Sequence, residues 1–326
     1  TKKDMQKAID HHIIEISHRS PQFSQVSEKT ITELKKFMGI PESYRVFYTA
    51  SATEAMMSTI QNTVEEHIFH FTNGSFSEKW AKMSESLGKK ITKDETQWGY
   101  QNDFLNVDIP QETEVITVTY NETSTGVTCQ NSDIRYLHEK YPEKLLAVDI
   151  TSAAGGVKVN IKEADIWLFS VQKCFGLPAG LGILILSPRA YKKAQALEMK
   201  NKNTAGLLNW SGMDKKMHEI YQTIMTPNVL NIFLLGEKCQ RWNQRGGIDQ
   251  IETERETKRQ IFKDAITSHP DLDFFVTNPA HRSKVVLCGK ASEPVIEKLH
   301  EQCQKQNFVC GKGYGKLKKT CFRIAN

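Results

Sequence analysis

Short apolar runs that alternate with helical patterns constrain the fold of this chain most strongly. Residues 181–186 form an apolar run that is far shorter than the about 18 residues of a membrane helix and is typical of a strand buried on both faces. Similar runs lie earlier in the chain, at residues 45–49, 67–71, 114–120, 144–150 and 165–170. Because helical patterns separate several of these runs, the sequence predicts an α/β fold with a mostly parallel sheet covered by helices.

The two ends of the chain predict different structures. Residues 1–44 predict a helix, a polar loop and a second helix, which Gly39 and Pro41 end. From about Pro227 an apolar helix begins, and a charged helical stretch continues to about residue 268. Short apolar, strand-like runs then follow at residues 273–276, 284–287, 308–310 and 320–324, and residues 293–304 predict one more helix. We therefore expect a large domain over residues 1–228 and, over residues 229–326, a long connecting helix with a small α+β domain.

Composition excludes several classes of protein. The 326 residues include 43 Lys and Arg and 38 Asp and Glu, and the resulting net charge of +5 is too small to indicate a nucleic-acid partner. Hydrophobic residues make up 39% and charged residues 25%, as in globular proteins, and no run predicts a membrane span. The seven cysteines form no C-x-x-C pair, which argues against a disulfide framework or a metal site and favours the reducing cytoplasm. No targeting pattern opens the chain, and because it starts at Thr1 without Met we expect it to be trimmed.

Polar side chains follow the predicted strands at the point where each one ends. In an open parallel sheet, ligands bind beyond the carboxyl ends of the strands. The residues found there are Ser51–Thr53, Asn73–Phe76, Asn121–Gly126, Asp149 with Thr151 and Ser152, and Gln172–Lys173. One edge of the sheet would therefore hold an anion site at a helix start, an aromatic ring, hydroxyl groups, a carboxylate and a lysine.

Lys173 is the most informative of these residues. Alone, a lysine is usually a solvated surface residue, just as Ser51–Thr53 is usually a plain helix cap, Phe76 a core residue and Asp149 a turn cap. Lys173, however, lies between a buried strand and the Gly- and Pro-rich segment 174–182. Together these residues fit pyridoxal phosphate (PLP). A lysine amine can form a Schiff base with its aldehyde, a carboxylate can keep its pyridinium protonated, an aromatic ring can stack on it, and a helix N-terminus can bind its phosphate.

The same residues resemble a known family. Asp149–Ala153 followed by Phe169–Gly180 resembles the cofactor signature of class V aminotransferases of PLP fold type I. Three further segments resemble that family's other cofactor loops: Ser51–Glu54, Asn73–Phe76 and Asn121–Gly126. Ser17–Phe23 resembles its substrate-facing segment, and Met225–Asn228 resembles the segment that reaches the cofactor phosphate of the neighbouring subunit. Phe322–Ile324 resembles its carboxylate-binding strand. The resemblance implies the fold of that family, with a mostly parallel seven-stranded sheet in a large domain and a small C-terminal domain.

This resemblance implies a cofactor site. Lys173 would be the Schiff-base lysine and Asp149 would pair with the pyridine nitrogen, so these two are the expected catalytic residues. Phe76 would stack on the cofactor ring, and Thr123 would hydrogen-bond near its phenolic oxygen. The phosphate ligands would come from two subunits of a homodimer with shared sites: Ala52, Thr53 and Gln172, with Thr226 of the partner subunit.

The resemblance also implies a substrate site. His18, Arg19 and Arg323 would face the amino-acid substrate, and the planar guanidinium of Arg323 suits a carboxylate. Among class V enzymes the chain is most similar to the phosphoserine aminotransferases, which implies amino transfer between phosphoserine and 2-oxoglutarate in serine biosynthesis. Two features differ from that group: Gly311–Gly315 replaces a His-Arg pair, and no arginine follows Ser51. Lysines near the C-terminus offer positive charge instead, at Lys312, Lys316, Lys318 and Lys319.

Two other functions fit the same fold. One is a class V aminotransferase with a different substrate, of the alanine– or serine–glyoxylate or –pyruvate type, which shares the His-Arg and Asn-Glu-Thr-Ser-Thr-Gly features. The other is a cysteine desulfurase-like lyase, which generally places a histidine over the ring and a nucleophilic cysteine on a mobile loop. Phe76 at the stacking position argues against the lyase, and we expect Cys310, the loop cysteine, to be a buried structural residue. Intact Lys173 and Asp149 argue against a non-catalytic protein.

Overall fold

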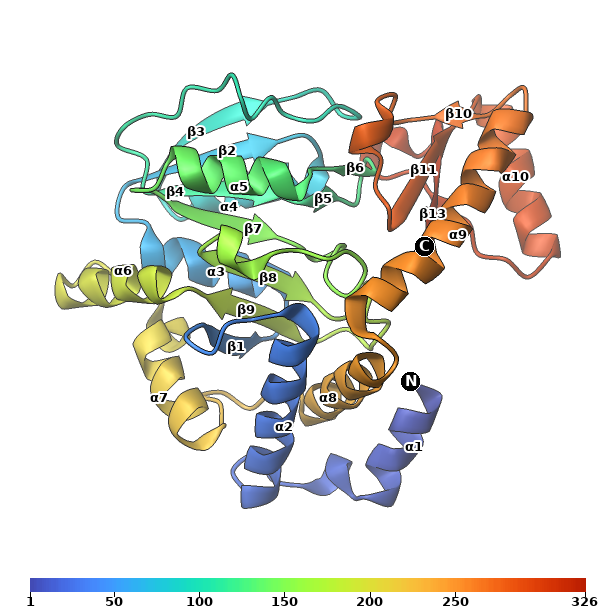
Figure 1. The fold of residues 1–326 in the computed structure, drawn as a ribbon. Coiled ribbons are helices and arrows are strands. Elements are labelled where there is room, and N and C mark those ends of the chain that lie inside the picture. Colours follow the sequence, from blue (N-terminus) through green and yellow to red (C-terminus); the bar gives the residue numbers. More distant parts are fainter.

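A seven-stranded sheet forms the centre of the larger unit of the protein (Figure 1). The computed structural model describes all of residues 1–326. The strand order is β1-β9-β8-β7-β4-β2-β3; β9 runs antiparallel to β1 and β8, and all other neighbours are parallel. The mostly parallel sheet expected from the apolar runs is thus confirmed. The strands are β1 (Arg45–Thr49), β2 (His67–Thr72), β3 (Lys90–Glu95), β4 (Val115–Thr119), β7 (Leu145–Asp149), β8 (Ile166–Ser170) and β9 (Gly182–Leu186).

One strand of this sheet, β3, is not predicted by the apolar runs. It contains only exposed and half-buried residues and pairs only with β2. Because an edge strand needs no burial on both sides, it does not require an apolar run.

The strand predicted at residues 308–310 is absent from the structure, so this prediction is wrong. Phe308 and Val309 are exposed there, and the short strand β12 (Gly311–Lys312) follows instead.

Helices cover both faces of the large sheet, as the alternating pattern predicts. In Figure 1, α5 lies in front of the sheet, and α3 and α4 lie behind it. None of the helices is both long enough and apolar enough to span a lipid bilayer. The helices are α1 (Lys2–Asp10), α2 (Pro21–Met38), α3 (Ala52–Thr63), α4 (Ser75–Ser86), α5 (Asn131–Lys140), α6 (Pro188–Met199), α7 (Trp210–Ile220), α8 (Val229–Gln244), α9 (Gly247–Ser268) and α10 (Glu293–Lys305).

The N-terminal helices α1 and α2 pack against α8 of the larger unit. The expected pair of helices is present, and Gly39 ends α2 with a φ of +66°. Gly236 lets α2 and α8 approach closely, since a Cβ at this position would lie 2.5 Å from Oγ1 of Thr30. The Thr30 hydroxyl donates a hydrogen bond to the carbonyl of Ile232 at 3.0 Å. Residues of α8 therefore belong to the core of the larger unit.

The smaller unit contains a four-stranded antiparallel sheet in the order β10-β11-β13-β12. Helix α9 connects the two units, because Ile251 lies in the larger core and Phe262 in the smaller one. The helical stretch expected as one long helix is divided between α8 and α9, where Gly246 takes a φ of +101°. The division into domains after residue 228 stays a prediction. The remaining strands are β10 (Asp273–Phe274), β11 (Val286–Lys290) and β13 (Cys321–Ala325), with a hairpin of β5 (Asn121–Glu122) and β6 (Val127–Thr128) in the larger unit.

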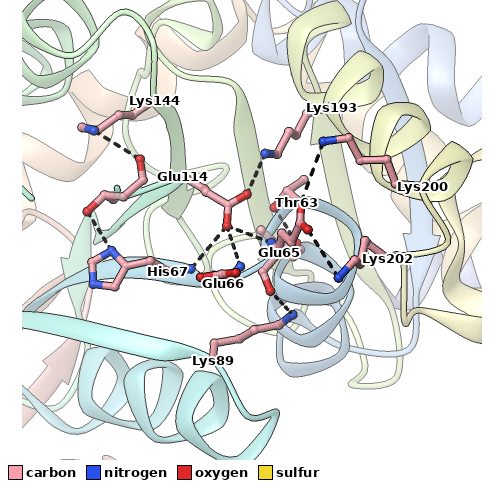
Figure 2. A network of polar contacts seen from close by, with 12 residues as sticks. Thr63, Glu65, Glu66, His67, Lys89, Glu114, Lys144, Lys193, Lys200 and Lys202 are labelled. Atoms are coloured by element: carbon pink, nitrogen blue, oxygen red, sulfur yellow. Dashed lines mark hydrogen bonds and ion pairs between the residues drawn. The ribbon is translucent and has the colours of Figure 1, made fainter. Parts of the chain in front are cut away.

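A network of charged side chains holds the amino-terminal edge of the large sheet (Figure 2). Glu114 lies just before β4, and its Oε1 accepts hydrogen bonds from the backbone N–H groups of Glu65, Glu66 and His67 at 2.9, 2.7 and 3.3 Å. Its Oε2 lies 2.6 Å from Nζ of Lys193 on α6. Burial alone would raise the pKa of Glu114, but these hydrogen bonds and the Lys193 charge hold it below its ordinary value.

Candidate active site

Asp149 is the last residue of β7 and is only 4% exposed. Its Oδ1 accepts hydrogen bonds from the backbone N–H and the hydroxyl of Thr151, at 2.8 and 2.5 Å, whereas its Oδ2 accepts none. Burial raises the pKa of Asp149 to about 6, against the effect of the Thr151 hydrogen bonds, and the negative charge of Glu122 adds to the rise. The buried carboxylate therefore has one free acceptor atom and is largely ionised at neutral pH.

Lys173 lies in the loop that follows β8. A turn shapes this loop, in which the backbone N–H of Gly176 donates to the Lys173 carbonyl at 2.9 Å. The Lys173 ammonium makes no hydrogen bond and no ion pair. Its pKa is lowered, first because the surrounding protein desolvates it and second because Arg323 carries the same charge, while Cys174 and Asp149 oppose the shift. Lys173 is an exposed residue, and the charges of Asp149 and Arg323 both influence the pKa of its unpaired amine.

Arg323 brings the smaller unit to the same edge of the sheet. Its Nη1 donates to the carbonyl of Thr123 at 2.8 Å, across 200 positions of sequence, and its Nε donates to the carbonyl of Lys312 at 3.0 Å. Its Nη2 has no partner. The ring of Tyr314 faces the guanidinium, with 5.5 Å between Cζ and the ring centre. Two anchored nitrogens and one free nitrogen make a directional cation suited to a carboxylate.

Hydroxyl and amide groups join the loops that follow β4, β7 and β8. The Thr123 hydroxyl donates to Oγ of Ser152 at 2.9 Å, and Nδ2 of Asn121 donates to the same atom at 2.8 Å. The Cys174 thiol donates to the carbonyl of Ser152 at 3.3 Å. Gln172 is exposed, and its side chain bonds no other residue of the chain. The loops predicted to meet at the strand ends are therefore in contact.

Phe76 is held at the start of α4 by a buried carboxylate that sequence reasoning missed. Glu122 is fully buried, and its Oε2 accepts hydrogen bonds from the backbone N–H groups of Phe76 and Ser77 at 3.1 and 3.0 Å. A negative charge is favourable at a helix N-terminus. Gly74 makes room for it, since a Cβ there would lie 2.3 Å from Cγ of Glu122. The half-buried Phe76 ring lies 5.3 Å from the ring of Tyr314.

The N-terminus of α3, where the sequence predicts an anion site, has one free backbone donor. Ser51 caps the helix, and the Ala52 N–H donates to Oγ of Ser170 at 2.6 Å. The N–H of Thr53 has no partner. Oγ1 of Thr53 accepts a hydrogen bond from Nζ of Lys79 on α4 at 3.0 Å. Ser170 and Lys79 are two more residues of this region that the sequence reasoning missed.

Comparison with known proteins identifies the family. Residues 5–307 match the family model described as Aminotransferase class-V. The chain belongs to the class V aminotransferase family. It is therefore a transferase of amino groups, as the resemblance implied, and its α/β architecture is that of PLP fold type I.

Solved and curated class V relatives cover most of the chain. A crystal structure of a phosphoserine aminotransferase from Cytophaga hutchinsonii ATCC 33406 is 35% identical, covers 100% of this chain and 89% of that chain, and has a TM-score of 0.95. A phosphoserine aminotransferase of Rhodococcus opacus strain B4 is 29% identical over 276 residues, which are 83% of this chain and 71% of the relative. An aspartate aminotransferase from Thermus thermophilus, 20% identical over 95% of this chain and 86% of its own, shares the fold with a TM-score of 0.82.

The remaining expected site residues of this class V chain form a separate group. Arg19 donates from Nη2 to the carbonyl of Ile224 at 2.7 Å and from Nη1 to the carbonyl of Thr223. Thr226, a few residues on, is exposed and lines a cavity of about 560 Å³. His18 is half-buried beside Arg19. No hydrogen bond or ion pair joins this group to Asp149, Lys173 or Arg323 within one chain.

The lysines near the C-terminus do not gather at the site. Lys319 pairs with Glu293 at 2.9 Å, and Nζ of Lys316 lies 4.4 Å from the ring centre of Trp98. Lys312 is paired with Phe322 in the sheet register, so its side chain projects from the face opposite to that of Arg323. Tyr314, which the sequence reasoning did not single out, is the member of this loop that contacts both Phe76 and Arg323.

Cys310 bears on the alternative lyase function. The residue is 9% exposed and belongs to the core of the smaller unit. Burial raises the pKa of its thiol to about 12. The expectation of a buried structural cysteine is confirmed, and because the thiolate is the nucleophilic form, this thiol is poorly suited to attack.

Proposed function

We propose that the protein catalyses PLP-dependent amino transfer between O-phosphoserine and 2-oxoglutarate. The observation that carries the proposal is the unpaired amine of Lys173 in the loop after β8, whose pKa responds to both the carboxylate of Asp149 and the guanidinium of Arg323. The relatives from C. hutchinsonii and R. opacus are phosphoserine aminotransferases, which supports the choice of substrate. With this substrate the reaction belongs to serine biosynthesis, and we place it in the cytoplasm.

The residues at the strand ends fit PLP. Oδ2 of Asp149 is an acceptor on a buried carboxylate without a partner, as the ring N–H of the cofactor requires. The free N–H of Thr53 and the hydroxyl of Ser170 are donors for its phosphate at the N-terminus of α3. Phe76 has a half-buried ring available for stacking. When bound, PLP supplies an electron sink for the electrons released at the substrate Cα.

The other predicted cofactor contacts complete the proposed site. We assign Thr123 to the neighbourhood of the phenolic oxygen because its hydroxyl lies in the strand-end network with Ser152. We assign Ala52 and Gln172 to the phosphate, because one begins α3 and the other is exposed next to Lys173 with an unused amide.

The proposed chemistry divides the work among three side chains. Nζ of Lys173 is the base that removes the proton from the substrate Cα, and its lowered pKa raises the share of the neutral amine that can do so. Asp149, with a pKa of about 6, is ionised at neutral pH and stabilises positive charge on the ring nitrogen. Arg323 holds the α-carboxylate through Nη2 and so keeps Cα within reach of Lys173.

A comparison of amino donors tests the substrate. The holoenzyme is mixed separately with O-phosphoserine, serine, alanine and glutamate, and the change of the cofactor's visible absorbance is followed in the first half-reaction. We expect phosphoserine and glutamate to react, and phosphoserine to react faster than alanine and serine. If phosphoserine is no faster than alanine, the phosphoserine assignment fails and an aminotransferase of another substrate type remains.

We further propose a homodimer in which each site receives residues from both subunits. Arg19 is bonded to the carbonyls of Thr223 and Ile224, so it forms one surface with Thr226. No hydrogen bond or ion pair joins this surface to Lys173 in its own chain, although both are expected to serve one site. We therefore assign Arg19 and His18, like Thr226, to the site of the partner subunit.

Mixed dimers test this arrangement. Subunits carrying Lys173→Ala are combined with subunits carrying Arg19→Ala, each inactive alone. If Arg19 acts across the interface, every mixed dimer contains one site with both residues intact, and activity returns to roughly a quarter of the wild-type level by random assortment. If Arg19 acts within its own chain, no mixed dimer has a complete site and activity stays absent. A monomer at micromolar concentration would contradict the proposal outright.

A further inference from the structure

Lys79 is an exposed lysine whose amine reaches the first turn of a neighbouring helix. It lies on α4 one turn after Phe76, so the two side chains share one face of that helix. Its only hydrogen bond is to Oγ1 of Thr53, at 3.0 Å, in the first turn of α3. The partial charge of a helix N-terminus is positive, and a cation placed there is unfavourable in the absence of an anion.

The neighbouring carboxylates form no ion pair with Lys79 and instead accept hydrogen bonds from other groups. Glu54, on α3, accepts a hydrogen bond from the Ala50 N–H at 2.6 Å. Glu78, next to Lys79 in sequence, accepts one from Nε1 of Trp98 at 2.6 Å. Lys79 itself forms no ion pair. The sequence thus brings an unpaired cation, a free backbone N–H and hydroxyl groups to one helix terminus.

We propose that Lys79 binds the phosphate of the cofactor and supplies the positive charge of the phosphate site. This inference rests on the proposed function, which places PLP at this terminus. A phosphate beside Thr53 would accept a hydrogen bond from Nζ, and the ammonium would then be paired. No arginine follows Ser51 on α3, and Lys79 on α4 is the cation that bonds to the first turn of that helix.

The affinity of the full-length protein for two ligands tests the proposal. PLP is removed from the purified holoenzyme, and PLP or pyridoxal, which lacks the phosphate, is titrated back while protein fluorescence is recorded. We expect Lys79→Met to weaken PLP binding about tenfold or more, the effect of losing one charge-assisted hydrogen bond. The affinity for pyridoxal should change less than about twofold, because pyridoxal has no group for Lys79 to bind.

Two further variants make the test specific. Lys82→Met, at an exposed lysine one turn further along α4, should leave both affinities unchanged. Lys79→Arg should restore much of the affinity for PLP, because it returns the charge. Equal losses of PLP and pyridoxal affinity in Lys79→Met, or no loss of either, would overturn the assignment of Lys79 while leaving the proposed function intact. A wild-type chain that does not bind PLP at all would overturn both.

Discussion

The two edges of the large sheet differ in whether their charged side chains have partners within the chain. At the amino-terminal edge, Figure 2 shows Glu114 satisfied by three backbone N–H groups and Lys193, and Glu65 paired with Lys200 and Lys202 at 4.0 and 3.6 Å. At the carboxyl-terminal edge, charged atoms lack partners. They are Nζ of Lys173, Nη2 of Arg323 and Oδ2 of Asp149.

The difference lies between charges that are paired within the chain and charges that are free to bind a ligand. At the amino-terminal edge, ion pairs and hydrogen bonds within the chain offset the free-energy cost of removing the charged groups from water. At the other edge Lys173 is exposed to water, whereas the free oxygen of Asp149 belongs to a buried carboxylate, and a buried polar atom without a partner costs stability unless a ligand completes it. Buried polar atoms without partners also occur at this carboxyl-terminal edge, at Thr72 Oγ1, Thr119 Oγ1 and Asn121 Oδ1. The proposed site lies at this carboxyl-terminal edge.

The largest expected effect is that of Lys173→Ala. The substitution should lower amino transfer by at least about 10³-fold, because no other base at the strand ends can replace the amine. Steady-state kinetics with a saturating donor measure it. Lys193→Ala, at the opposite edge, is the matched control and should keep its activity while losing stability. A folded but equally inactive Lys193→Ala variant would break the contrast between the edges.

Asp149→Asn should lower kcat by roughly 10²-fold while PLP still binds. The amide keeps the shape of the carboxylate and can accept the Thr151 hydrogen bonds, but it removes the negative charge from the ring nitrogen. Absorbance spectra report the bound cofactor, and initial rates report kcat. A loss of about tenfold or less would mean that the unpaired oxygen of Asp149 contributes little.

Arg323→Lys should lower kcat/KM for the amino donor about 30-fold or more, which corresponds to roughly 2–5 kcal/mol in transition-state binding. An ammonium cannot keep the bond to the Thr123 carbonyl and also offer a second, fixed donor to a carboxylate. Arg259→Lys, at an arginine paired with Glu256, is the matched control and should change kcat/KM little. Equal kinetics of the two variants would remove Arg323 from the site.

Glu114→Gln should leave kcat unchanged and lower the free energy of unfolding by about 1–2 kcal/mol. Because the pKa of Glu114 is lowered in the folded chain, its stabilising effect is present above its ordinary pKa and is lost as the pH falls through the folded value. Urea unfolding at neutral and acidic pH should therefore show a difference that shrinks in acid. Glu66→Gln, at an exposed residue 3.8 Å from Lys90, should cost less than about 0.5 kcal/mol.

Local patterns were sufficient for most of the large sheet and for the centre of the site. Apolar runs located β1, β2, β4, β7, β8 and β9, because burial on both faces leaves a signature in consecutive residues. They missed β3, whose edge position asks for no such run. The strand-end rule placed Asp149 and Lys173 at one edge, and the structure puts them close enough to shift each other's pKa. Their roles stay predictions until the variants are measured.

The sequence by itself determined six of the seven strands of the large sheet, the loops at the strand ends and the family. The tertiary structure decided which distant residues complete those loops. Arg323 reaches Thr123, Lys79 reaches Thr53, and Glu122 caps the helix that carries Phe76. Such contacts depend on how whole helices and the smaller unit pack, and no local periodicity records that packing. The free or paired state of each charge, which distinguishes the two edges, is therefore a property of the folded chain alone.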